Sequence, residues 1–204
     1  MRAHEAGALH ADLAHNGPAW LRPPADPNAL LARLWPATVT RGADGVLTVG
    51  GLRVTDLAAR YGTPAYILDE TDLRARCRDF VAAFPDTDVY YAGKAFLCRA
   101  VVRIIAEEGL SLDVCTGGEL AVALSAGMDP ARIALHGNNK SLDELRRAVD
   151  AGVGRIVVDS FQEIDRLTAL ARERGVRPAV LVRVTVGVEA HTHEYIATAH
   201  EDQK

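Results

Sequence analysis

Lysine is scarce in this sequence, and its scarcity narrows the chemistry that the chain can offer. Of the 23 basic residues only three are lysine, namely Lys94, Lys140 and Lys204. The guanidinium of arginine stays protonated and cannot form a Schiff base with an aldehyde, whereas the amine of lysine can. Any chemistry that needs a primary side-chain amine therefore falls on one of these three residues.

Other features that the sequence lacks exclude whole classes of protein. No apolar run approaches the roughly 20 residues that a membrane-spanning helix needs, and the first residues contain no apolar core of a signal peptide. A net charge of -4 and a pI near 6.0 disfavour a nucleic-acid-binding protein, which is usually basic. The three cysteines cannot all pair with one another, and none lies in a CxxC motif. We therefore expect a cytoplasmic protein with reduced cysteines and without nucleic-acid or membrane partners.

Composition divides the chain into three parts. Residues 1–27 are rich in alanine, histidine and proline, which predicts a mobile arm. Residues 28–62 predict a short helix at 28–35 and a β-hairpin at the Gly50-Gly51 pair. Residues 63–204 alternate apolar segments with amphipathic stretches and predict one α/β domain.

The alternation within 63–204 is regular. Strands are predicted at six apolar segments: 65–68, 89–93, 112–115, 133–136, 155–158 and 179–184. Helical stretches lie between these segments, and several of them stop at a glycine, which is suited to the residue that ends a helix: Gly109, Gly127, Gly152 and Gly175. Alternating units of this kind predict a parallel sheet covered by helices.

Two architectures fit this pattern, an open doubly wound sheet and a (β/α)8 barrel. No glycine-rich phosphate loop of the GxGxxG or GxxxxGK type follows the first predicted strand, which weakens the nucleotide-binding version of the open sheet. We therefore expect a TIM-type barrel. It is incomplete, because five or six strands are predicted where eight are needed.

Lys94 directly follows the apolar segment VYYAG, at the carboxyl end of a predicted strand. Functional residues of parallel α/β sheets and barrels collect at this end of the strands. We expect the amine to lose hydration there, which makes it easier to deprotonate and able to attack an aldehyde. The alternative that position leaves open is a strand-end lysine that only reaches water.

Three further polar residues lie at the ends of other predicted strands. Asp113 could hold a cation or orient a cofactor group, or it could form a structural ion pair or helix cap. His136 could line a pocket, or it could be a structural group held by its neighbours. Arg183 lies in the apolar segment VLVRVTV, so we expect it in a buried strand with an acidic partner, for which Asp113 is a candidate.

The histidine-rich segment near the end of the chain offers possible metal ligands. Glu189, His191, His193 and His200 are ligand types, and an HxH pair on a strand places both imidazoles on one face. No cysteine or second carboxylate cluster accompanies them, and the segment is typical of a loop. We therefore predict no metal site and favour a solvated lid over the barrel mouth.

Five sequence blocks resemble the diaminopimelate decarboxylase family, within the fold-type III pyridoxal-phosphate enzymes that also include ornithine and arginine decarboxylases and alanine racemase. The blocks are YYAGKAF (90–96), LDVCTGGEL (112–120), HGNNKS (136–141), VVDS (157–160) and VEAHTHEYIATAHEDQK (188–204). The first two are shared across the decarboxylases, and the last is more particular to the enzymes that act on diaminopimelate. The resemblance runs from about residue 28 to the last residue.

The resemblance implies a cofactor, pyridoxal 5'-phosphate, and an amino-acid substrate. Lys94 matches the lysine that bonds to the cofactor, Ala92 and Asp113 match positions of the cofactor pocket, and Arg183 matches a pocket arginine. We add His136 to this pocket. The implied reaction is loss of CO₂ from meso-2,6-diaminopimelate to give L-lysine, in which the cofactor ring takes up the electrons of the broken bond.

The resemblance also implies parts that these 204 residues lack. The family pattern continues with a histidine that stacks on the cofactor, a glycine-rich phosphate loop, a glutamate that faces the pyridine nitrogen and a cysteine donated across a homodimer. It places a strand from residues 28–62 in a β-rich domain that follows the barrel. We therefore expect an amino-terminal half that is inactive by itself, with two exposed sheet edges.

Three alternatives stay open. The chain could belong to another fold-type III decarboxylase or racemase, it could be a non-catalytic relative that keeps the barrel, or it could be a fragment without a separate function. The sequence also leaves open whether Lys140 contacts substrate or solvent.

Overall fold

The computed structural model describes residue 26, residues 28–32 and residues 34–185. The chain divides into two compact units, Met1–Asp69 and Glu70–Lys204, and each is described by itself. The arm predicted at 1–27 falls almost wholly outside the described residues, and the segment that contains His191 and His193 lies outside them entirely.

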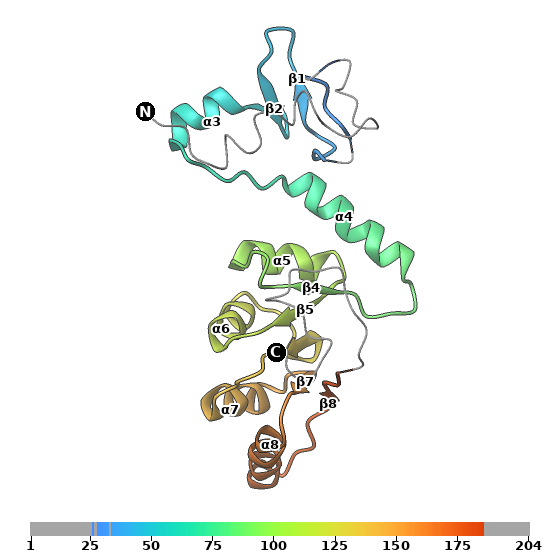
Figure 1. Cartoon of the computed structure of the whole chain (residues 1–204), viewed down its shortest axis with the longest axis vertical. Coiled ribbons are helices and arrows are strands. Elements are labelled where there is room, and N and C mark those ends of the chain that lie inside the picture. The colour runs from blue at the N-terminus through green and yellow to red at the C-terminus, as the bar shows by residue number, and fades with distance from the viewer. Residues whose placement is uncertain (1–25, 27, 33, 186–204) are drawn as a thin grey trace, which may run out of the picture. The chain divides into compact units, whose positions relative to one another are not determined.

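The amino-terminal unit contains a small antiparallel sheet with the order β1-β2-β3 (Figure 1). Its strands are β1 (Thr40–Arg41), β2 (Leu47–Val49) and β3 (Leu52–Arg53). The pairing of Val49 with Leu52 closes the β2–β3 hairpin over Gly50 and Gly51, which confirms the hairpin predicted from the glycine pair. The helix α3 (Val54–Tyr61) follows directly and ends at Gly62.

Two predictions in this unit are wrong. The described residues of 28–35 form turns instead of a helix, because the side chain of Asp26 accepts a hydrogen bond from the Asn28 amide at 2.8 Å and the local backbone closes a turn. Residues 65–68 do not form a strand. Tyr66, Ile67 and Leu68 are exposed there, and a strand forms only where a neighbour pairs with it.

The second unit is built on a five-stranded parallel sheet. Its strands are β4 (Tyr90–Ala92), β5 (Ser111–Val114), β6 (Ile133–Leu135), β7 (Arg155–Val158) and β8 (Val180–Val182). They pair in chain order, β4-β5-β6-β7-β8. An open doubly wound sheet reverses its strand order at a switch point, so this uninterrupted order is that of a barrel. The partial (β/α)8 architecture predicted from the sequence is confirmed.

Helices alternate with these strands, and the helices α5 to α8 all cover the same face of the sheet (Figure 1). The helices of this unit are α4 (Glu70–Ala83), α5 (Arg99–Glu107), α6 (Gly117–Ser125), α7 (Leu142–Ala151) and α8 (Phe161–Arg174), with a short 3-10 turn at Pro130–Arg132. Gly152 and Gly175 end α7 and α8 in the left-handed conformation, as predicted. The other face of the sheet is the interior of the partial barrel.

The hydrophobic core lies between the sheet and the helices. Leu112 and Val114 of β5 point into it, and the intervening Asp113 points to the other face, because side chains alternate along a strand. Each fully buried leucine or isoleucine contributes about 1.5–3 kcal/mol of transfer free energy. In contrast, all three residues of β8 are exposed, since no described strand or helix covers its outer edge.

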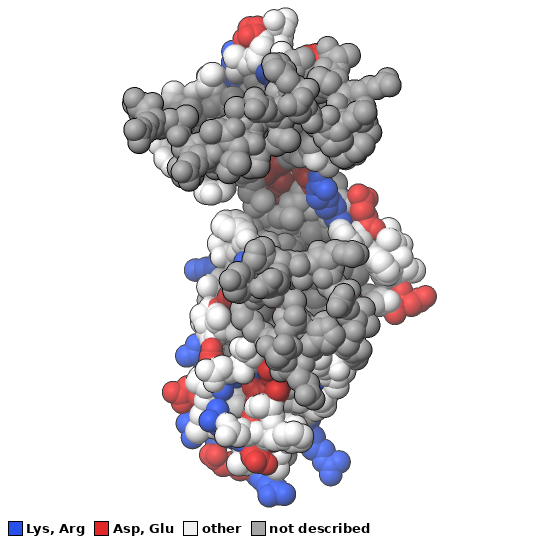
Figure 2. Space-filling model, viewed as in Figure 1, with Lys and Arg blue, Asp and Glu red and all other residues white. Residues whose placement is uncertain are grey.

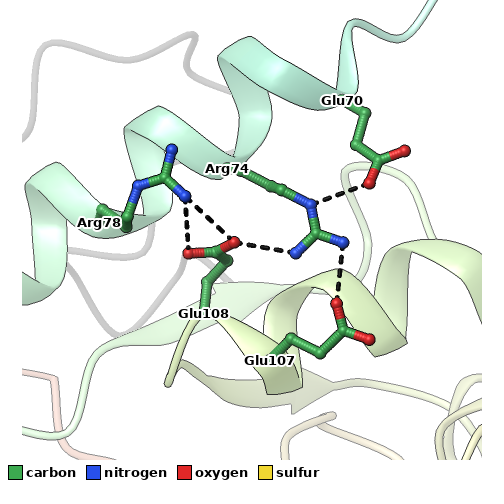
Figure 3. Close-up of polar contacts among 5 residues, drawn as sticks. All are labelled: Glu70, Arg74, Arg78, Glu107 and Glu108. Atoms are coloured by element: carbon green, nitrogen blue, oxygen red, sulfur yellow. Dashed lines mark hydrogen bonds and ion pairs between the residues drawn. The ribbon is translucent and has the colours of Figure 1, made fainter.

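An ion-pair network fastens α4 to the end of α5 (Figure 3). Arg74 lies between three carboxylates, those of Glu70, Glu107 and Glu108, each with an N–O distance of 2.8 Å. Arg78 reaches Glu108 at 3.2 Å. The hydrogen bond from Arg74 holds the pKa of Glu108 below its usual range, so this carboxylate stays charged at neutral pH.

Basic and acidic side chains are interspersed over the described surface of the second unit in the view of Figure 2. They include exposed ion pairs such as Arg174 with Asp150 at 2.7 Å, which joins α8 to α7, and Arg146 with Asp143 at 3.2 Å on α7. Water and salt screen such pairs, so they contribute little to stability.

Candidate functional site

Lys94 lies in a tight turn between β4 and α5. The Ala95 amide bonds to the Ala92 carbonyl at 3.1 Å, and the Gly93 amide bonds to the Asp113 carbonyl at 2.8 Å, so the turn is tied to the neighbouring strand β5. A Cβ at Gly93 would lie 2.9 Å from that carbonyl oxygen, which leaves room only for glycine. Lys94 therefore has a fixed backbone position beside the end of β5.

The side chain of Lys94 is exposed. The predicted loss of hydration is therefore wrong for the described part of the chain, where only five strands surround the interior. Among the described residues no carboxylate forms an ion pair with Lys94 within 4.0 Å. Its amine is accessible to a reagent or cofactor from solvent.

Asp113 and His136 meet at the carboxyl ends of β5 and β6. Asp113 is partly buried, and its Oδ1 contacts Nδ1 of the half-exposed His136 ring in a short hydrogen bond. The His136 amide donates to the Val114 carbonyl at 2.7 Å, which continues the β5–β6 pairing by one residue. Because Nδ1 is held by the carboxylate, the other ring nitrogen, Nε2, remains for a ligand.

Arg183 pairs with Asp159 and not with Asp113. Its Nη1 lies 3.2 Å from Oδ1 of Asp159, and its amide bonds to the Val158 carbonyl at 3.0 Å. The candidate partner Asp113 was wrong because it lies on β5, whereas Asp159 follows β7, the immediate neighbour of β8. The buried strand expected around Arg183 is also wrong, since β8 is exposed and Arg183 comes just after its end.

Acidic residues in the first turns of α6 and α8 fix the strand ends. Glu119 accepts from the Cys115 amide at 2.6 Å, and Glu163 accepts from the Asp159 amide at 2.8 Å. Each glutamate follows a capping Thr or Ser by three residues, and its amide bonds to that hydroxyl. The pattern [S/T]-x-x-E in the sequence could have revealed both glutamates.

Glu144 accepts hydrogen bonds from backbone amides at the start of its own helix, α7, and at the start of α6. One carboxylate oxygen accepts from the Ser141 amide at 2.8 Å, and the other accepts from the Gly117 amide at 2.7 Å. The hydrogen bond from the Ser141 amide, followed by that from the Gly117 amide, holds the pKa of Glu144 below its usual value. The loops after β5 and β6 are thereby joined.

Cys115 lies next to these groups as a protonated thiol. Burial raises the pKa of Cys115, and the nearby carboxylates of Asp113 and Glu119 raise it further, while the positive charges of Lys94 and Lys140 oppose the rise. A protonated thiol of this kind packs as a small apolar group. All three cysteines are free.

Lys140 is the residue whose role the sequence left open, and its side chain is buried from solvent. Only 1% of its side chain is exposed. Its Nζ pairs with Glu163 at 2.9 Å and donates to the carbonyls of Val157, at 2.7 Å, and Gly137. No pattern along the chain indicates this burial, because Lys140 follows the polar residues Asn138 and Asn139.

The inner face of the sheet forms a concave cavity of about 470 Å³. Asp113 and His136 line it, together with Asp86, Thr87, Asp88, Tyr90, Ala134, Arg155 and Leu181. Lys94, Ala92 and Arg183 are not among its lining residues. A larger apolar groove of about 680 Å³ lies between α8 and β8, away from these polar groups, so it does not mark the candidate site.

The side chains at this end of the sheet have the chemical groups that pyridoxal phosphate would need for binding. One accessible primary amine, Lys94, is available for the cofactor aldehyde, and Ala92, two residues before it at the end of β4, presents only a methyl group. The Asp113–His136 pair and the Asp159–Arg183 pair offer polar contacts at the same end of the sheet.

In the described part of the chain no group of three metal-ligating side chains occurs, and no helix has both the length and the apolar character of a membrane span.

A parallel barrel half with an exposed lysine amine at the carboxyl end of its first paired strand can bind an aldehyde cofactor. The chain belongs to the pyridoxal-dependent decarboxylases: the family model of their pyridoxal binding domain matches residues 70–204. The cofactor of this family is pyridoxal phosphate.

Curated relatives are more specific. The chain is similar to diaminopimelate decarboxylase of Mycobacterium leprae, with 56% identity over 207 residues that cover 100% of this chain and 44% of the relative. It is also similar to the enzyme of the same name from Mycobacterium bovis, with 61% identity over 176 residues, 86% of this chain and 39% of the relative. The chain thus spans less than half the length of these relatives.

Solved structures of decarboxylases share the fold of this chain. Diaminopimelate decarboxylase of M. jannaschii in complex with L-lysine matches with a TM-score of 0.70 and 28% identity, over 82% of this chain and 41% of that one. Lysine/ornithine decarboxylase of Vibrio vulnificus with putrescine matches with a TM-score of 0.61 and 25% identity, over 74% and 39%.

Proposed function

We propose that this chain is the cofactor-binding, amino-terminal part of an enzyme that decarboxylates meso-2,6-diaminopimelate to L-lysine and CO₂. The observation that carries the proposal is the accessible amine of Lys94 in a pyridoxal binding domain. The substrate follows from the relatives named diaminopimelate decarboxylase at 56% and 61% identity.

Each candidate residue receives a role from its position. Lys94 would hold the cofactor through its amine and would hold or return a proton there, and the small Ala92 leaves space beside it. Asp113 holds His136 through Nδ1, which leaves Nε2 available for a contact with the cofactor. Arg183, held by Asp159, offers its remaining N–H groups to an anionic group. The cofactor, when bound, supplies an electron sink for the bond that breaks.

The proposal includes parts beyond the described residues. Residues 63–204 form the first part of a pyridoxal-phosphate barrel, and the hairpin within 28–62 joins a β-rich domain. The whole protein is a cytoplasmic homodimer that acts on a small amino acid. These assignments rest on the sequence resemblance and on the share of each relative that the chain covers.

The test is a substrate comparison on a protein that carries this chain with a complete barrel. We expect CO₂ release and L-lysine formation from meso-2,6-diaminopimelate, and loss of both on Lys94→Arg, which keeps a charge but has no amine. The isolated 204-residue chain should release no CO₂. CO₂ release from diaminopimelate by the Lys94→Arg variant would refute the role of Lys94.

A second candidate is decarboxylation of ornithine or lysine, favoured by the structural match to the Vibrio vulnificus enzyme. The same assay separates the two, because it can be run with L-ornithine and L-lysine at equal concentration. Preference for either over meso-2,6-diaminopimelate would select this second candidate.

A further inference from the structure

Lys140 and Glu163 form a buried ion pair that the proposed chemistry does not use. Their side chains are 1% and 6% exposed, and Nζ lies 2.9 Å from Oε1. Among the described residues they are the only charged residues that are buried. A pair so fully removed from water is unusual, because desolvating two charges often costs more than their attraction returns.

Three acceptor groups surround Nζ of Lys140. They are the carbonyls of Gly137 and Val157 and the carboxylate of Glu163. An ammonium has three donors, and two of them are used in hydrogen bonds to the carbonyls. The contact to Oε1 of Glu163, at 2.9 Å, is an ion pair without hydrogen-bond geometry. Lys140 is thus held in place by two hydrogen bonds and one ion pair.

The pair connects two loops at the carboxyl end of the sheet. On one side it holds Gly137, the residue directly after His136. On the other side Oε2 of Glu163 accepts from the Asp159 amide at 2.8 Å, and the Asp159 side chain holds Arg183. Lys140 and Glu163 are buried and do not line the candidate site. They act on it through His136, which precedes Gly137, and through Asp159.

We propose that Lys140 and Glu163 are positioning residues for the cofactor site: their ion pair fixes the loops after β6 and β7, so that His136 and Asp159 stand where the cofactor bound at Lys94 requires them. This inference rests on the proposed function, because it concerns the same site. It assigns the buried pair a role beyond the stability of the core.

The test replaces both charges together, as Lys140→Met/Glu163→Leu, so that neither charge is left buried alone. The matched control removes an exposed pair between the neighbouring helices, as Arg174→Met/Asp150→Leu. Two quantities are measured on each folded 204-residue chain: the dissociation constant for pyridoxal phosphate, from absorbance and visible circular dichroism, and hydrogen exchange of the His136 amide. That amide touches neither replaced side chain, since its partner is the Val114 carbonyl.

We expect the double variant to bind pyridoxal phosphate at least about tenfold more weakly, with an altered dichroism band, and to exchange the His136 amide faster. The control should match the parent chain in both measurements. A folded double variant with the parent's dissociation constant and exchange rate would overturn the proposal, because a merely structural pair moves neither.

Two safeguards keep the test decisive. If the double variant does not fold, Glu163→Gln takes its place, since it keeps an oxygen for the Asp159 amide and removes only the charge; the same two outcomes then decide. If the parent chain binds no pyridoxal phosphate, the proposed function fails in this chain, whereas the exchange rate of the His136 amide still decides whether the pair positions the loop.

Discussion

The turn after β4 and the loop after β6 each carry one lysine at the same end of the same sheet, yet the two amines differ in every physical respect. Lys94 is exposed and has no carboxylate partner among the described residues. Lys140 is buried, with two carbonyls and a carboxylate around its Nζ. The amine of Lys94 is available for reaction, and the amine of Lys140 is not.

The comparison teaches that residue type and position in the fold do not by themselves define a reactive lysine. Both residues follow strands of a parallel sheet, where functional groups collect. What separates them is the surrounding backbone: the β4–α5 turn presents Lys94 outward, and the β6–α7 loop folds Lys140 back over Gly137. One labelling experiment and three sets of substitutions test this difference between the two lysines.

The largest expected effect is the difference in acylation rate between the two amines. In the folded chain Lys94 should react with acetic anhydride like a free lysine, whereas Lys140 reacts only after the structure opens. An opening free energy of about 4 kcal/mol makes the reaction of Lys140 about a thousandfold slower. Peptide mass spectrometry after timed labelling measures both rates, and comparable rates would break the comparison.

The next effect is the stability lost when the buried pair is broken. Lys140→Met leaves the Glu163 carboxylate buried without its cation, and we expect the free energy of unfolding to fall by about 3–5 kcal/mol. Lys140→Met/Glu163→Leu should recover most of this loss. Urea unfolding gives the values, and a single variant as stable as the double variant would argue against a buried charge pair.

A smaller effect is expected at the glycine before each lysine. Gly137 has φ +115, and a Cβ there would lie 3.1 Å from the Cys115 carbonyl oxygen, so Gly137→Ala should cost about 1–3 kcal/mol. Gly93→Ala places a Cβ 2.9 Å from the Asp113 carbonyl oxygen without a strained φ, and this clash with backbone should cost a similar amount. Thermal or urea unfolding compares them, and a neutral Gly137→Ala would contradict the loop geometry.

The smallest expected effect is on how the free energy of unfolding depends on pH. It comes from Glu144, whose carboxylate accepts from the amide of Ser141, the residue after Lys140. The folded chain holds the pKa of Glu144 below its ordinary 4.5, so the carboxylate's contribution is complete above that value and is lost as pH falls through the lowered one. Glu144→Gln should therefore flatten the decline in stability as pH falls from 4.5 through the lowered pKa of Glu144. Asp143→Asn, on the same turn and exposed, is the control; equal slopes for both variants would exclude this role of Glu144.

Much of the fold could be predicted from the sequence because its signals are local. Apolar segments, capping residues and the glycines that end helices gave five strands of the sheet and the helices between them. The segment 65–68 has the same apolar pattern but does not pair, since pairing depends on a neighbour that no local pattern specifies.

The positions of the candidate residues in the fold could be predicted from the sequence, but their contacts could not. Lys94, Asp113 and His136 lie at strand ends as the sequence indicates. The partner of Arg183 depends on which strands are neighbours, and the burial of Lys140 depends on how a polar loop folds back. Both are tertiary properties, and no spacing along the chain encodes them.

The most direct measurement of the central claim is reduction of the chain with borohydride in the presence of pyridoxal phosphate, followed by peptide mapping of the modified lysine. The account predicts one equivalent of label on Lys94 and none on Lys140. Label on Lys140, label scattered over the lysines, or no label on Lys94 would contradict it.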